Sequence, residues 1–318
     1  MQRRSGIPVG GYQMAIIDLS VDLKFATLKN PIIPASGTFG YGEEFEDFYP
    51  LDQLGAFILK GIYKNPRAGN PPPRIHETPS GLLNSIGLAG PGAEKLKDII
   101  TRVHGMTSTP IIVNVCGEED EEYLEVAEIF DPMPEVGMLE LNISCPNVRE
   151  GGKCPAQDED HTFRLVQLIR QNTRKPLIVK LSPNVADVAS VAVAAQEGGA
   201  DAVSLVNTFL GMAVDLKARK PVFKNIFAGL SGPAIKPLAL RLVWLVAQSV
   251  DIPVIGIGGI SSGRDVLEYI LVGASAVQTG TINMVEPTAT LRILEELRDE
   301  MEALGISKLD ELRGTLEI

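Results

Sequence analysis

The six residues Asn142-Ile143-Ser144-Cys145-Pro146-Asn147 bring together the side chains of this sequence that are best suited to chemistry. They follow the apolar run 138–141, which is typical of a buried strand, and they open a loop that contains two glycines. A carboxamide offers hydrogen-bond donors and an acceptor to a planar polar ligand, and a thiolate is a base or a nucleophile. Taken alone, the stretch equally fits a buried cysteine in a turn, because free cysteine often packs as a small hydrophobic residue.

Two lysines indicate an anionic ligand. Lys60 and Lys180 each stand at the end of a short apolar run, where an ammonium group is costly to bury unless it meets an anion or a carbonyl oxygen. Either lysine alone can reach solvent along its aliphatic stem. Two of them at the ends of buried strands are hard to explain by packing, which favours a binding role for both.

The elements that must position these residues alternate regularly along the chain. Apolar runs predict strands at 31–36, 56–61, 110–114, 138–142, 176–180, 202–208, 253–259 and 276–281. Apolar residues three and four apart predict helices at 43–48, 94–103, 121–129, 159–172, 187–197, 235–249, 264–271 and 287–303. This alternation predicts a parallel sheet covered by helices, and eight units favour an α/β fold of the TIM (β/α)8 barrel type.

We expect one barrel domain over residues 16–318, preceded by a flexible lead-in over residues 1–15. The segments 16–21 and 23–28, around Asp22, predict a small hairpin before the barrel. Three connections are long, at 62–92, 145–158 and 209–234. Because long connections in a compact domain are usually lids or binding loops, we expect them to form the mouth of the active site.

Each predicted strand ends in a residue that can contact a ligand. Barrel active sites lie at the C-terminal ends of the strands, so these residues are expected to converge on one face. They are Ser36, Lys60, Asn114, Asn142, Lys180, Asn207, Gly258-Gly259 and Gly280-Thr281.

Glycine-rich segments predict a phosphate site. The loop 256–263 follows the seventh strand and the segment 278–281 ends the eighth, and glycines there let backbone N–H groups approach a phosphate. Barrels frequently bind phosphate between these two loops. A third cluster, at 229–232, can add donors. The spacing does not match the dinucleotide-binding pattern G-x-G-x-x-G.

Composition argues against several classes of function. With 29 basic and 40 acidic side chains, the net charge of −11 argues against nucleic-acid binding and a basic membrane anchor. No run reaches the about 18 apolar residues of a transmembrane helix, and three cysteines are too few for a disulfide framework, which favours the cytoplasm. His76, His104 and His161 lack metal-ligand spacing, and Cys145 and Cys154 alone make a poor metal pair, so no metal is expected.

Five motifs occur here in the order of one enzyme family. They are Asn-Ser-Ile-Gly-Leu at 84–88, Asn-Ile-Ser-Cys-Pro-Asn at 142–147, Val-Lys-Leu-Ser-Pro at 179–183, Gly-Leu-Ser-Gly at 229–232 and Gly-Ile-Gly-Gly-Ile at 256–260. From about residue 17 onward the chain resembles class 1 dihydroorotate dehydrogenases, and in detail the catalytic subunit of the NAD-dependent class 1B. The resemblance implies a barrel that holds FMN at its mouth and oxidises dihydroorotate to orotate in pyrimidine (UMP) synthesis.

The resemblance also implies a role for each candidate residue. Cys145 is the base that removes a proton from substrate C5, while FMN takes the hydride from C6. The pyrimidine and its carboxylate are held by Lys60, Asn84, Ser85, Ile86, Gly87, Leu88, Asn142, Asn207 and Thr208. FMN is held by Ser36, Lys60, Gly61, Asn114, Asn142, Lys180, Val206, Gly232, Gly258, Gly259, Gly280 and Thr281.

A partner is expected to carry the electrons onward. The chain has no second nucleotide fingerprint for NAD or FAD, its cysteines are not spaced for an iron–sulfur cluster, and no apolar N-terminal segment reaches toward membrane quinone. The class 1B resemblance implies an electron-transfer subunit with FAD and a [2Fe–2S] cluster, in a heterotetramer of two catalytic and two electron-transfer subunits.

Other readings of the residues remain. Within redox chemistry they are a fumarate-dependent class 1A enzyme and a dihydropyrimidine dehydrogenase-like subunit, although Lys60 with Asn84 favours a carboxylated ring. A non-redox alternative is a phosphate-binding aldolase or isomerase with Lys180 as a Schiff-base lysine. A non-catalytic binding barrel leaves Cys145 unexplained.

Overall fold

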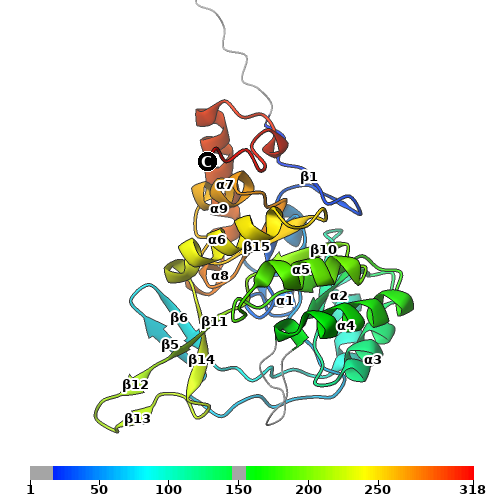
Figure 1. Ribbon diagram of the computed structural model, residues 1–318, viewed down its shortest axis with the longest axis vertical. Coiled ribbons are helices and arrows are strands. Elements are labelled where there is room, and N and C mark those ends of the chain that lie inside the picture. The colour runs from blue at the N-terminus through cyan, green and yellow to red at the C-terminus, as the bar shows by residue number, and fades with distance from the viewer. Residues whose placement is uncertain (1–16, 145–154) are drawn as a thin grey trace, which may run out of the picture.

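An eight-stranded parallel sheet forms the centre of the computed structural model, which describes residues 17–144 and 155–318 (Figure 1). Neighbouring strands follow the order β3, β16, β15, β10, β9, β8, β7, β4. The bounds are β3 (Ile32–Pro34), β4 (Phe57–Ile58), β7 (Ile111–Val115), β8 (Val136–Asn142), β9 (Leu177–Lys180), β10 (Ala202–Leu205), β15 (Val254–Ile257) and β16 (Ala276–Thr279). The backbone N–H of Gly55, just before β4, donates to the carbonyl of Ile32 in β3 at 3.3 Å, which brings the end strands together. The predicted barrel fold is confirmed, whereas the predicted lead-in, residues 1–15, lies outside the described residues.

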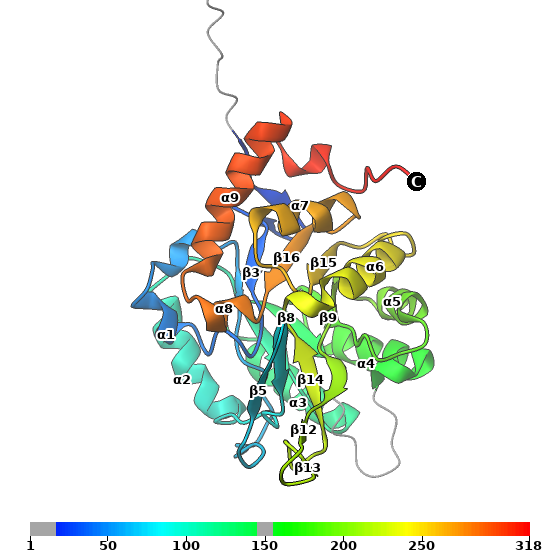
Figure 2. The ribbon, with the colours of Figure 1, turned by 90° about the vertical axis from the view of Figure 1, so that its left-hand side faces the viewer.

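Helices surround the strands, as Figure 2 shows. They are α1 (Glu43–Glu46), α2 (Ala93–His104), α3 (Asp120–Phe130), α4 (Glu159–Asn172), α5 (Val188–Glu197), α6 (Lys236–Ala247), α7 (Gly263–Leu271), α8 (Ile282–Val285) and α9 (Ala289–Leu304). The spacing of apolar residues explains their packing, because α2 buries Leu96, Ile100 and Val103 along one stripe. All the predicted helices are present within a few residues of the expected bounds. The short α8 and the 3-10 turns are not predicted, since one turn is too short to show a period; these turns are Leu51–Gln53, Pro155–Gln157, Pro233–Ile235 and Leu309–Glu311.

Side-chain caps define where several helices begin. The Asp158 carboxylate accepts the His161 N–H at the start of α4, and Asp187 accepts the Ala189 N–H at the start of α5. Such caps satisfy backbone donors that have no partner inside the helix, and each stabilises a helix by about 1 kcal/mol. No helix within the described ranges is long and apolar enough to cross a membrane.

The predicted N-terminal hairpin is present, with its turn shifted. Strand β1 (Val21–Asp22) pairs antiparallel with β2 (Thr27–Leu28). Asp22 therefore belongs to a strand and the turn lies at residues 23–26, closed by the Leu23 N–H to the Ala26 carbonyl at 2.9 Å. The shift arises because the Asp22 carboxylate accepts the Lys24 N–H at 2.7 Å and so stabilises the turn that follows it.

A second sheet stands at one end of the barrel and is not predicted from the sequence (Figures 1 and 2). Its four antiparallel strands lie in the order β11 (Phe209–Met212), β14 (Phe227–Ser231), β6 (Gly81–Asn84) and β5 (Ile75–Thr78). A small two-stranded hairpin, β12 (Val214–Asp215) with β13 (Lys220–Pro221), extends from it. The connections 62–92 and 209–234, expected as loops, therefore pair with each other through β6 and β14. In the third long connection, residues 145–154 lie outside the described residues.

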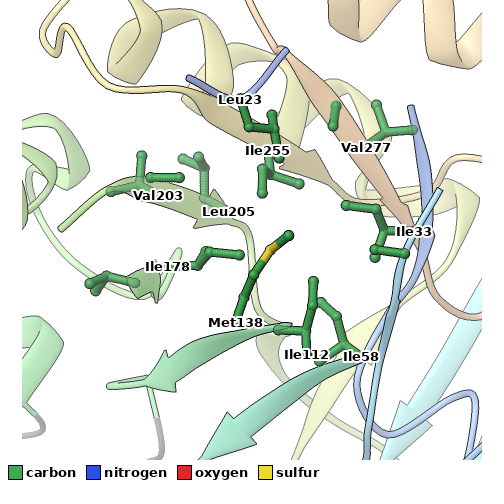
Figure 3. Close-up of a cluster of buried hydrophobic side chains, with 14 of the residues drawn as sticks. Leu23, Ile33, Ile58, Ile112, Met138, Ile178, Val203, Leu205, Ile255 and Val277 are labelled. Atoms are coloured by element: carbon green, nitrogen blue, oxygen red, sulfur yellow. The ribbon is translucent and has the colours of Figure 1, made fainter. Parts of the chain in front are cut away.

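Apolar side chains fill the interior of the barrel. Ile33, Ile58, Ile112, Met138 and Ile178 come from five strands and gather there (Figure 3), and none is more than 2% exposed. Burial of each such side chain is worth about 1.5–3 kcal/mol. The packed interior leaves the ends of the strands as the place for a ligand.

Candidate functional site

Inward-facing positions change from apolar to polar near the carboxyl ends of the strands. Side chains of a strand alternate between two faces, so a residue two positions further along points the same way. Asn114 follows Ile112 in this manner on β7, and Lys180 follows Ile178 on β9. Asn114 is fully buried and Lys180 is 5% exposed, so both polar groups lie inside the barrel mouth.

A cavity of about 500 Å³ opens at these strand ends. All eight barrel strands, or the loops directly after them, contribute to its wall. The predicted site residues on that wall are Ser36, Lys60, Gly61, Asn84, Ile86, Leu88, Asn114, Asn142, Lys180, Val206, Asn207, Thr208, Gly232, Gly258, Gly259, Gly280 and Thr281.

Among the described residues, two predicted site residues are not on the wall. Ser85 and Gly87 lie in the same loop as Ile86 and Leu88 but face Asn70: the Asn70 Nδ2 donates to Ser85 Oγ at 3.0 Å. A Cβ at Gly87, where φ is +72°, would come 2.5 Å from the Asn70 side chain. Ser85 and Gly87 therefore fix the shape of the loop, and the loop places Ile86 and Leu88 on the cavity wall. Cys145 lies outside the described residues.

The Lys180 side chain is almost fully buried, and its ammonium group has no partner among the described residues. It lines the cavity at 5% exposure, and no carboxylate or carbonyl oxygen of the described ranges accepts a hydrogen bond from it. A buried unpaired charge is costly, so the site is suited to an anionic or electron-rich ligand. Lys60 is half-buried on the same wall, and burial, with repulsion from Arg74, lowers the pKa of its ammonium group.

Glycines build a narrow cradle on one side of the cavity. At Gly259, where φ is +68°, an added Cβ would lie 2.8 Å from the Gly232 carbonyl oxygen; at Gly258 it would lie 2.5 Å from the Ala239 Cβ. The loop continues into α7, and the Asp265 carboxylate holds it by accepting the Ser261 N–H at 2.8 Å. Close backbone approach beside a helix N-terminus suits a phosphate group.

Carboxamides supply the polar groups opposite this cradle. Asn142 Nδ2 donates to Asn114 Oδ1 at 3.3 Å, and Asn207 Nδ2 donates to Asn142 Oδ1 at 3.4 Å. On the second sheet, Asn84 Nδ2 donates to the Gly229 carbonyl at 3.3 Å. With a phosphate cradle, two ammonium groups and apolar walls, the donor set fits a phosphorylated planar cofactor and a small polar ring. No group of three His, Cys, Asp or Glu side chains in the described part of the chain is placed to hold a metal ion.

Sequence reasoning missed two residues of this region. Glu140 is fully buried below Asn142 on β8, and Ser144 donates to Asn142 Oδ1 at 2.7 Å. The signal for Glu140 is a charged residue inside an otherwise apolar strand. Ser144 carries no comparable signal, because its role depends on how the turn after β8 folds.

Comparisons with known proteins agree with this geometry. The family model described as dihydroorotate dehydrogenase matches residues 18–301. The chain is 51% identical over 310 residues to a Geotalea daltonii protein, covering 96% of this chain and all of that protein. It is 52% identical over 304 residues to a Geotalea uraniireducens protein, covering 94% of this chain and 98% of that protein. Both relatives are named dihydroorotate dehydrogenase B (NAD(+)), catalytic subunit.

The fold also matches a solved structure, DHODH from Eimeria tenella in complex with ferulenol. The TM-score is 0.80 at 22% identity, over 97% of this chain and 91% of that one, and it shows a shared fold. Together with the curated relatives, the family match confirms the family predicted from the five motifs, and with it an oxidoreductase that acts on dihydroorotate. The chain belongs to the dihydroorotate dehydrogenase family.

Proposed function

We propose that this chain is the FMN-binding catalytic subunit of an NAD+-linked dihydroorotate dehydrogenase that works in the cytoplasm. It oxidises (S)-dihydroorotate to orotate in de novo pyrimidine synthesis. One observation carries the proposal: the ammonium group of Lys180, whose side chain is almost fully buried, has no partner among the described residues and faces a cavity lined by four asparagines and a glycine cradle.

FMN fits the glycine side of the cavity. The backbone of Gly232, Gly258, Gly259 and Gly280, with Thr281, would hold its phosphate. The ring would be held by Ser36, Lys60, Gly61, Asn114, Asn142, Lys180 and Val206. When bound, FMN supplies an acceptor for the hydride that leaves substrate C6. Lys180 would stabilise negative charge on the ring through an ammonium group already in place.

Dihydroorotate fits the carboxamide side. Its ring carries amide groups that alternate donors and acceptors, which match Asn84, Asn142 and Asn207. Its carboxylate is an anion that suits Lys60. The remaining contacts would come from Thr208 and from the loop that contains Ser85, Ile86, Gly87 and Leu88.

Cys145 is the proposed base. A proton next to a carbonyl needs a base with a pKa near the working pH, and a thiol can be tuned to that range. Cys145 directly follows Ser144, whose Oγ bonds to the Asn142 carboxamide. The thiolate takes the proton from C5 while the hydride leaves C6, and the C5–C6 double bond of orotate forms.

The electrons then leave through a second subunit. The relatives' designation as catalytic subunits supports a partner, and we infer that it carries FAD and a [2Fe–2S] cluster and reduces NAD+. We place two copies of each subunit in a heterotetramer, because two-fold symmetry is the commonest closed arrangement of identical chains.

The experiment is to assay the isolated chain with dihydroorotate and either NAD+ or fumarate. NAD+ reduction should be absent with the chain alone and should appear when the partner subunit is co-expressed. Fast fumarate reduction by the chain alone would contradict the inference that a partner subunit is needed, and it would favour the fumarate-dependent class.

A further inference from the structure

A buried carboxylate lies beneath the cavity, outside the set of residues assigned to binding. Glu140 is 0% exposed and stands two residues before Asn142 on β8. Its Oε1 accepts hydrogen bonds from Ser204 Oγ and Gln278 Nε2, both at 2.8 Å. Its Oε2 accepts from Asn114 Nδ2 at 2.6 Å. Three donors from three other strands offset the cost of burying the charge.

From Glu140, hydrogen bonds run in one direction toward the substrate side. Because Asn114 Nδ2 faces the carboxylate, Asn114 Oδ1 faces away from it and accepts from Asn142 Nδ2 at 3.3 Å. Asn142 Oδ1 then accepts from Ser144 Oγ at 2.7 Å and from Asn207 Nδ2 at 3.4 Å. Each carboxamide thus donates toward Glu140 and accepts on its other side.

The series of hydrogen bonds that starts at Glu140 is also fixed at its other end, at Asn207. The backbone N–H of Thr208 donates to Asn207 Oδ1 at 2.8 Å. A carboxylate only accepts and a backbone N–H only donates, whereas a carboxamide can be turned over with little change in shape. The two anchors therefore select one of the two orientations for every carboxamide between them. Reversal of Asn114 would bring its oxygen against the Glu140 carboxylate.

We propose that Glu140 is a positioning residue that sets which edge of Asn114, Asn142 and Asn207 is presented to the ligands. The inference rests on the proposed function, in which these carboxamides hold the flavin and the pyrimidine. All three line the cavity. A pyrimidine edge alternates N–H donors and carbonyl acceptors, so a reversed carboxamide would place donor against donor.

Glu140→Leu removes the acceptor and frees Asn114 to turn. We expect the Kd for orotate to rise about tenfold or more, the usual consequence of an unpaired polar contact in a binding site. Ser204→Ala is the matched control, because it removes one donor to the same carboxylate and keeps the Asn114 bond. The control should keep the orotate Kd within about twofold of the parent, well below the effect of one lost buried contact.

The double variant Glu140→Gln/Asn114→Asp separates hydrogen-bond direction from fold. The glutamine carbonyl can accept from Ser204 and Gln278, and its NH2 can donate to the new aspartate. The second aspartate oxygen still accepts from Asn142 Nδ2, and the net charge is that of the parent. Every hydrogen bond beyond position 114 keeps its direction, so orotate binding should recover toward the parent value. A residue needed only for its local charge would not be rescued by this exchange, because the negative charge moves from position 140 to position 114.

Orotate binding is measured from the change in the visible flavin spectrum, with FMN at saturating concentration and thermal unfolding recorded in parallel. Weak binding in Glu140→Leu with recovery in the exchange variant supports the inference. Parent-like binding in Glu140→Leu overturns it, as does an exchange variant as weak as Glu140→Leu. If Glu140→Leu does not fold, the exchange variant alone decides. If orotate does not change the flavin spectrum of the parent chain, the proposed function is overturned. This outcome differs from the outcomes that overturn the role of Glu140, in which the parent chain binds orotate.

Discussion

Replacement of Cys145 by alanine is expected to leave FMN bound and to slow flavin reduction by dihydroorotate by roughly 10²–10⁴-fold, the range for loss of a general base. The variant keeps the residues proposed to hold the cofactor, so the defect should appear in the chemical step. Stopped-flow measurement of the flavin absorbance under anaerobic conditions gives the rate directly. Cys145→Ser should also be slow near neutral pH, because a hydroxyl group is a much weaker acid than a thiol.

The other cysteines serve as controls for this experiment. Cys116 is fully buried beside Asn114, with its Sγ 3.5 Å from Asn114 Oδ1, and Cys154 stands nine positions after Cys145 in the sequence. Alanine at either position should slow flavin reduction far less than at Cys145. Reduction of the Cys145→Ala flavin at the parent rate would show that another group is the base.

Replacement of Lys180 by methionine should make the FMN-free chain more stable and should slow flavin reduction in the FMN-bound chain. Without ligand, the buried ammonium group has no partner among the described residues, so its removal should stabilise the free chain by on the order of 1–3 kcal/mol. With FMN, the same change removes the cation proposed to face the ring. Flavin reduction should then slow by about 10²–10³-fold, as when one preorganised electrostatic group is lost.

Thermal unfolding of both forms and an FMN titration check this prediction. Lys64→Met is the control, because Lys64 forms an exposed ion pair with Glu125 at 2.8 Å, and such pairs contribute little to stability. Lys64→Met should leave the FMN affinity unchanged and should shift the unfolding midpoint only slightly. A Lys180→Met chain that is less stable without FMN, yet binds FMN as the parent does, would contradict the assigned role.

The barrel and most of its mouth can be predicted from the sequence because both depend on local signals. Each buried parallel strand is a continuous apolar run, and the ligand-facing residue stands at its end, as Lys180 does after Leu177–Val179. Helix starts are likewise local, since a capping carboxylate such as Asp187 precedes the first turn. These signals need no knowledge of distant partners.

What the sequence could not predict depends on contacts between distant segments. The second sheet forms because β6 and β14, which lie far apart in the chain, pair through Leu83 and Leu230. The register of such pairing is not visible in either short segment alone. In the same way, Glu140 stands out as a charge in a strand, but its partner Gln278 lies on β16. The direction of the carboxamide chain follows only once these contacts are known.

Anaerobic titration of the purified chain with dihydroorotate shows whether the chain binds FMN and passes electrons from dihydroorotate to it. We expect a yellow protein with one FMN per chain, whose flavin absorbance bleaches as dihydroorotate is added and orotate appears in equal amount. A colourless chain that cannot be reconstituted with FMN, or a bound flavin that dihydroorotate leaves oxidised, would contradict this expectation.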